Sequence, residues 1–190
     1  VWEPEVRIST MEHFSWTPTI AATGEHVSIA WSDTFDAQAA SLEEEYFARS
    51  SDFGATWGQP QRLTNDPPEA LASSWAPSLM AAGSVRVLKW FDDRDGNWEI
   101  YAMRSIDHGA TWSAETRMTF TETSSVRPSI AHVGNEVFVA YWEEDGAGAA
   151  DLFLLYSSDL GATWYTGLPL DVAPGGSTRP SIAASTHGAH

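Results

Sequence analysis

Two arginines of this sequence each stand directly before a proline, at matching points of a repeated pattern, where they could supply positive charge to a ligand. They are Arg127 and Arg179. Trp16 and Trp75 stand one residue earlier in their own copies of the pattern. Because sugar sites pair aromatic platforms with planar hydrogen-bonding groups, these four residues and Arg94 suit a glycan. Two structural roles compete with that interpretation: ion pairs with nearby carboxylates for the arginines, and packing between repeats for the tryptophans.

Acidic side chains gather in the segments that follow the second predicted strand of each repeat. They are Asp33, Asp36, Asp92, Asp93, Asp95, Glu143, Glu144 and Asp145. Oxygen ligands alternate along Asp93, Asp95 and Asn97 as in a calcium-binding loop, which makes these three the candidate metal ligands. The twelve-residue calcium spacing is incomplete, and Asp95-Gly96-Asn97 also suits a tight hairpin turn. Apart from this candidate calcium site we expect no cofactor, because the histidines show no zinc spacing and cysteine is absent.

An eight-residue motif, Ser-x-Asp-x-Gly-x-Thr-Trp, occurs three times in constant register. Asp107 lies 55 residues after Asp52, and Asp159 lies 52 residues after Asp107. The aspartate can accept backbone N–H bonds across its own turn, glycine permits a positive φ, and the hydroxyls tie the hairpin. We therefore assign a structural role to the motif residues: Ser50, Asp52, Gly54, Thr56 and Trp57; Ser105, Asp107, Gly109, Thr111 and Trp112; Ser157, Asp159, Gly161, Thr163 and Trp164.

Short β-branched and aromatic segments recur between the motifs, with turn residues between them and no sustained helical period. Four short strands in a repeat of about 54 residues are typical of a propeller blade. We predict an all-β fold, a β-propeller of four-stranded antiparallel blades, of which this chain holds about three and a half. The expected units are an outer strand at 1–10, blades at 11–65, 66–120 and 121–172, and the inner strand of a fourth blade at 173–190. Since propellers close with four to eight blades, the sequence predicts part of a larger or assembled ring.

The three motifs resemble the Asp-box, or BNR, repeat of sialidase-like propellers, and the resemblance spans essentially the whole chain. The resemblance implies a glycosidase site with carboxylate-binding arginines, a tyrosine nucleophile paired with a glutamate, and an aspartate as acid/base. The catalytic candidates on that basis are Asp93, Tyr141 and Glu143. The match is incomplete, because Ser9 stands where the family's Arg-Ile-Pro segment has proline after Arg7-Ile8. Tyr141 also occupies the position of Trp31 and Trp90, which favours a structural role.

Composition narrows the partners of this chain. The net charge of −16 and the ten scattered basic residues argue against nucleic acid, and no apolar stretch is long enough to span a membrane. The start of the chain carries no signal segment, so we interpret the sequence as a mature or excised piece. An acidic, lysine-poor surface fits an extracellular or cell-surface protein, which is the location we expect, and it also fits a salt-adapted protein, a cation-binding one or a surface that is acidic only for solubility.

Two functions remain open from the sequence. The first is an extracellular, non-catalytic propeller that binds glycans or proteins through the face bearing the loops between second and third strands. The second is part of a glycoside hydrolase, an exo-sialidase acting on sialylated glycans, with its remaining catalytic residues outside this segment. We expect the ligand to be a carbohydrate or a protein, and we expect self-association if several chains complete the ring.

Overall fold

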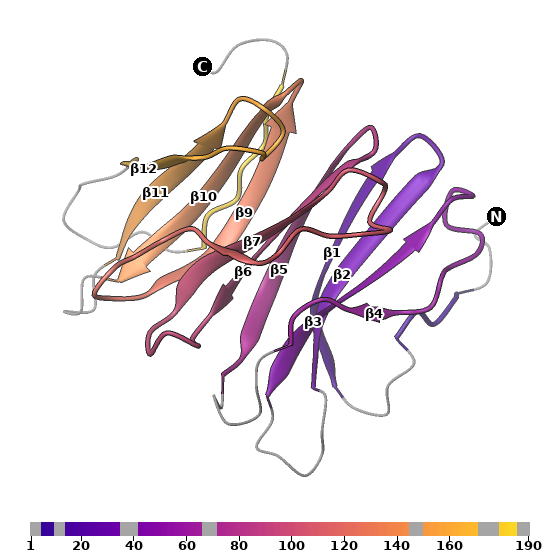
Figure 1. Cartoon of the computed structure of the whole chain (residues 1–190), viewed down its shortest axis with the longest axis horizontal. Coiled ribbons are helices and arrows are strands. Elements are labelled where there is room, and N and C mark those ends of the chain that lie inside the picture. The colour runs from indigo at the N-terminus through magenta and orange to yellow at the C-terminus, as the bar shows by residue number, and fades with distance from the viewer. Residues whose placement is uncertain are drawn as a thin grey trace.

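The computed structural model describes residues 5–9, 14–34, 42–65, 72–144, 150–170 and 179–185, and it contains β-strands and no helix within those ranges. The strands form three four-stranded antiparallel sheets, each in chain order (Figure 1). Blade 1 holds β1 (Ser15–Thr23), β2 (His26–Thr34), β3 (Glu43–Ser50) and β4 (Gln61–Arg62). Blade 2 holds β5 (Ser74–Ala82), β6 (Val85–Asp92), β7 (Glu99–Ser105) and β8 (Thr116–Arg117). Blade 3 holds β9 (Ser125–Val133), β10 (Glu136–Glu144), β11 (Ala150–Ser157) and β12 (Tyr165–Pro169).

The three sheets pack face to face, as blades do around a propeller axis (Figure 1). Their first strands contact one another in turn, β1 with β5 and β5 with β9, so these strands are the inner ones. Successive side chains of a strand point to opposite faces of the sheet, so alternate residues of a blade face the blade before it and the blade after it. Phe47 and Trp90 fill the junction of blades 1 and 2, while Phe91 and Tyr141 fill that of blades 2 and 3. The predicted all-β propeller architecture is confirmed.

Each inner strand contains a bulge near its start. Pairing with the second strand skips between Trp16 and Thr19 in blade 1 and between Trp75 and Ser78 in blade 2. The residue before proline has a left-handed backbone there, with φ of 54° at Arg127 and 60° at Arg179. Such a bulge re-aims a side chain, and a non-glycine residue at positive φ is held there against its own preference. The repeated proline pattern therefore marks a bent inner edge in each blade.

The three motif copies form the same turn, which we call the box turn. In the first copy, Thr56 donates its N–H to Asp52 Oδ1 at 2.8 Å and its hydroxyl to Asp52 Oδ2 at 2.6 Å. Ser50 Oγ accepts the Gly54 N–H at 2.9 Å. The other copies repeat these bonds within about 0.1 Å. These bonds fix the hairpin between the third and fourth strands in the way the residue types predict.

The box turns lie at the end of the blades that also carries the first hairpin turns. In blade 1, Phe53 of the box turn donates its N–H to the Glu25 carbonyl at 2.9 Å, and the other two blades repeat this bond. The loops between second and third strands are at the opposite end, because the strands run antiparallel. We call that opposite end the loop face.

The described residues near both ends of the chain continue the pattern without adding strands. Residues 5–9 and 179–185 belong to no sheet, yet Arg7 donates Nε–H to the Ser9 carbonyl just as Arg62 does to that of Thr64. Ile20 on the outer side of blade 1 is 64% exposed, whereas its counterpart Leu79 is 6% exposed under blade 1. The described part of the chain is thus a propeller segment whose outer blade faces are uncovered. No helix of these residues is long and apolar enough to cross a membrane.

Candidate functional site

Four inner segments meet around a shallow depression near the axis, which we call the axial depression. Its volume is about 360 Å³. Each segment contributes the residues of its proline bulge: Thr17, Pro18, Thr19, Ala76, Pro77, Ser78, Arg127, Pro128, Ser129, Arg179 and Pro180. The two arginines predicted to bind a ligand, Arg127 and Arg179, are thereby brought to one place although 52 residues separate them.

Serine hydroxyls hold the inner segments in register with one another. Ile130 of β9 donates its N–H to Ser78 Oγ of β5 at 3.0 Å. Ile182 does the same to Ser129 Oγ of β9 at 3.2 Å. Each serine follows the proline of its own segment, so the hydroxyl that accepts this bond lies two residues after the residue with the left-handed backbone. The backbone positions of Arg127 and Arg179 are therefore fixed by the same bond pattern.

Both arginines of the axial depression are exposed and lack an internal partner among the described residues. Within the described ranges, neither Arg127 nor Arg179 has an ion pair or a side-chain hydrogen bond, and both residues are exposed. The pairing with nearby carboxylates that competed with a ligand role does not occur among these residues. A guanidinium offers several N–H donors in a plane, which suits a carboxylate ligand.

The two candidate tryptophans occupy different surroundings. Trp75 is partly buried between the blades and donates its indole N–H to Glu43 Oε2 at 3.0 Å. Trp16 is 45% exposed on the uncovered side of blade 1, in a tilted contact with Phe14 at 5.6 Å between ring centroids. The ring of Trp75 therefore packs between blades, and that of Trp16 remains accessible.

Arg94 belongs to an internal ion-pair network on the loop face. It pairs with Asp92 at 2.6 Å and with Glu115, and its guanidinium lies 4.6 Å from the centroid of the Tyr101 ring. Burial raises the pKa of a carboxyl, but at Asp92 the bonds from Arg94 and Ser74 outweigh it and the pKa is lowered. Arg94 thus neutralises a fully buried carboxylate.

Tyr141 and Glu143 do form a pair, with the phenol donating to Glu143 Oε1 at 3.2 Å. Burial, and then the neighbouring Glu143 charge, raise the pKa of Tyr141 far above its usual value, and burial raises that of Glu143. The other blades have equivalent bonds, from Trp31 to Asp33 at 2.9 Å and from Trp90 to Asp92 at 3.2 Å. Tyr141, which is 2% exposed, therefore occupies a repeated packing position.

The candidate calcium ligands are engaged in separate contacts. Asp93 Oδ1 accepts the Ser73 N–H at 2.8 Å, while its carbonyl accepts the Gly96 N–H at 2.9 Å in a tight turn. Asp95 pairs with Arg117 at 3.0 Å, and the Asn97 amide donates to Glu99 Oε1 at 3.0 Å. Among the described residues, no three acidic or histidine side chains are grouped as a metal site. Calcium binding stays a prediction.

Sequence reasoning missed a run of buried acids at the start of β3. Glu43, Glu44 and Glu45 are all buried, and Glu45 Oε1 accepts from Ser32 Oγ at 3.1 Å. Burial raises the pKa of Glu45 well above its usual value. Three consecutive glutamates in the sequence could have pointed to this cluster, but charged residues at the start of a strand are usually exposed to solvent. Being fully buried, Glu45 cannot touch a ligand in the axial depression in this conformation.

Comparison with known proteins supports the fold. No protein-family model matches the sequence, and no curated protein does so either. Among solved structures, a Trypanosoma rangeli sialidase bound to 2,3-difluorosialic acid has a TM-score of 0.62 at 16% identity, covering 80% of this chain and 30% of its own. A Penicillium chrysogenum α-L-arabinanase complexed with arabinobiose has a TM-score of 0.64 at 17% identity, covering 92% and 56%. A Dyadobacter fermentans protein of unknown function has a TM-score of 0.67 at 15% identity, covering 90% and 58%. The chain therefore spans from about a third to somewhat over half of these structures and shares the propeller fold of sialidases and arabinanases.

Proposed function

We propose that this chain is part of a sialidase-like Asp-box propeller that binds an acidic glycan at the axial depression through Arg127 and Arg179. The observation that carries the proposal is that two exposed arginines with no internal partner in the described ranges line the same depression. Elsewhere in those ranges, Arg62, Arg94 and Arg117 are all paired with carboxylates. A strongly acidic protein that leaves two arginines unpaired at one place offers a specific site to an anion.

The residue type at the bulge, rather than its backbone, supports a ligand role. The left-handed conformation before proline recurs in every inner segment, with φ of 45° at Thr17 and 52° at Ala76 as well as at the two arginines. The equivalent positions in blades 1 and 2 hold Thr17 and Ala76, so the bulge itself does not require arginine. A carboxylate-bearing sugar would bind two guanidinium forks by charge-assisted hydrogen bonds of about 2.7–2.9 Å. Solved structures of similar fold include a Trypanosoma rangeli sialidase in complex with sialic acid.

A binding role is better supported than catalysis by this segment. The second candidate function, part of an exo-sialidase, rests on the Tyr141–Glu143 hydrogen bond. Tyr141 is buried, its pKa is raised, and Trp31 and Trp90 make the same kind of bond in the other blades. A nucleophilic phenol would need exposure and a lowered pKa. We place the protein outside the cell or on its surface, with further blades, from the same or another chain, completing the ring.

Binding of a sialoside by the full-length protein tests the proposal. We expect saturable binding of 3′-sialyllactose in calorimetry, weakened at least tenfold in an Arg127→Ala, Arg179→Ala variant. Arg49→Ala removes an exposed arginine at the box-turn end, away from the axial depression, so it is the control and should bind normally. Equal binding by the double variant and the wild type would refute the role of the arginines. Turnover of a fluorogenic sialoside that Tyr141→Phe abolishes would instead favour the enzyme.

A further inference from the structure

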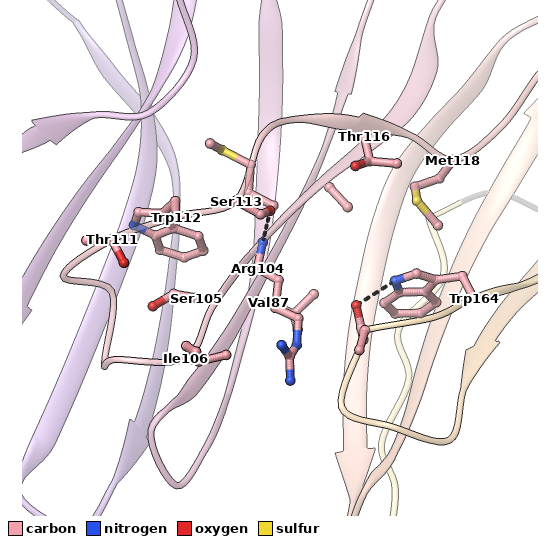
Figure 2. A pocket seen from close by; sticks show the side chains of 14 residues that line it. Val87, Arg104, Ser105, Ile106, Thr111, Trp112, Ser113, Thr116, Met118 and Trp164 are labelled. Carbon is pink, nitrogen blue, oxygen red and sulfur yellow. Dashed lines mark hydrogen bonds between the residues drawn. The ribbon is translucent and has the colours of Figure 1, made fainter.

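A second pocket lies at the rim of the propeller segment, between blades 2 and 3 at the end that carries the box turns. We call it the rim pocket, and its volume is about 490 Å³. Trp112 and Trp164, from the second and third box turns, stand on opposite sides of it (Figure 2). A volume of this size is within the range of small-molecule sites. Both walls come from described residues, so the pocket does not depend on further blades.

The rim pocket exists because one repeat exchanges a large side chain for a small one. In blade 1, Ala30 of β2 pairs with Phe47 of β3. The Phe47 ring packs edge-on against Trp112 at 5.1 Å and is so close to Gly109 that an added Cβ there would overlap it. In blade 2 the corresponding pair is Lys89 and Ala102, so the aromatic ring is missing at the next junction. The space that Phe47 fills beside one box turn is left open beside the following one.

The walls of the rim pocket combine aromatic rings with polar groups that have spare hydrogen-bonding capacity. Met103, Met118 and Val87 supply apolar surface between the indoles. Arg104 uses its Nε–H to bind the Leu160 carbonyl at 2.8 Å, and its terminal nitrogens have no partner among the described residues. Thr116 also lines the pocket and is exposed, with no hydrogen bond from its hydroxyl in the same ranges. These groups can form hydrogen bonds with a polar guest that a purely apolar guest could not make.

We propose that the rim pocket binds one pyranose ring of a glycan, as a second site distinct from the axial depression. The C–H face of a sugar packs on an indole ring, while its hydroxyls accept and donate hydrogen bonds to planar and hydroxyl groups such as those of Arg104 and Thr116. The rim pocket is at the box-turn end, whereas the axial depression is formed at the loop-face starts of the inner strands. This inference does not depend on the proposed function of the axial site.

The test uses the full-length protein and saturation-transfer NMR with three neutral sugars, which lack the carboxylate expected at the axial depression: N-acetylglucosamine, galactose and mannose. The decisive variant is Lys89→Ala, Ala102→Phe, which rebuilds the Ala30–Phe47 pair of blade 1 in blade 2 and fills the pocket. We expect at least one sugar to give saturable signals that this variant loses at least tenfold. The Arg127→Ala, Arg179→Ala variant should retain those signals, so failure of the axial site is separable from failure of the rim site.

If the filled variant does not fold, a second pair of variants still tests the inference. Thr116→Ala should weaken sugar binding several-fold without changing thermal stability, because Thr116 is exposed and outside the core. Gln61→Ala is its matched control, since Gln61 pairs with Phe47 as Thr116 pairs with Ala102. No signal from any of the three sugars would overturn the inference. Signals that survive in the filled variant, or that Thr116→Ala and Gln61→Ala affect equally, would also overturn it.

Discussion

Lys89 offers the sharpest test of how the blades pack, because it is the sole lysine of the sequence and is fully buried. Its Nζ lies 3.6 Å from the centroid of the Trp164 ring and has no hydrogen-bond partner among the described residues. Burial places its pKa well below the usual value. The lowered pKa favours the neutral amine between blades 2 and 3, and we choose Lys89→Met as the perturbation that tests it.

The effect on stability follows from proton binding. Wherever the folded chain has lost this proton and the unfolded chain still holds it, the free energy of unfolding rises with pH, and we expect that behaviour between pH 7 and 9. One proton contributes up to about 1.4 kcal/mol per pH unit, or up to about 3 kcal/mol over this range. Methionine has no charge to remove and leaves no unsatisfied polar group. Lys89→Met should therefore be more stable at pH 7, by about 1–3 kcal/mol.

Urea unfolding of the full-length protein and of Lys89→Met at pH 7, 8 and 9 measures both quantities. The difference in unfolding free energy between the two proteins should shrink as the pH rises, since only the wild type gains stability from this amine. The alternative is an ammonium held over the Trp164 face, an interaction worth about 2 kcal/mol when desolvated. A difference that stays constant with pH, or a methionine variant that is less stable than the wild type at every pH, would refute the neutral-amine account.

Two further predictions concern the box turns. Gly109→Ala should destabilise the protein by about 2–4 kcal/mol in urea unfolding, because Gly109 has a φ of 82° and an added Cβ would overlap the Phe47 ring. Gly24→Ala, with a φ of 58° and nothing within 4 Å, isolates the backbone strain, and an equal loss in both variants would contradict the contact. Hydrogen bonds from Ser50 and Thr56 lower the pKa of Asp52 to about 2, so the stability they add is present above the usual pKa and is lost as pH falls from about 4 to 2. Asp52→Asn should show a shallower loss of melting temperature between pH 5 and 2, and an unchanged pH profile would count against this role.

The sequence by itself determined the repeat, the strand content and the box turns. The motif contains every group that its turn uses, so Asp107 and Thr111 find each other within five residues whatever surrounds them. Strand positions followed from residue alternation and turn residues for the same reason, since both are local properties. The equivalence of Tyr141 with Trp31 and Trp90 could also be read from register alone.

Only the tertiary structure decided which chemical groups are available to a ligand. Arg94 and Arg127 looked equally suited to a glycan, yet Arg94 pairs with Asp92 and Glu115, while Arg127 has no partner in the described ranges. The sequence did not predict the rim pocket. The pocket arises because Ala102 stands where blade 1 has Phe47, and this difference in side-chain size matters only where a neighbouring blade packs on that position. Burial and pairing depend on contacts between residues about 50 apart, and such contacts are set by how the blades pack rather than by the local pattern.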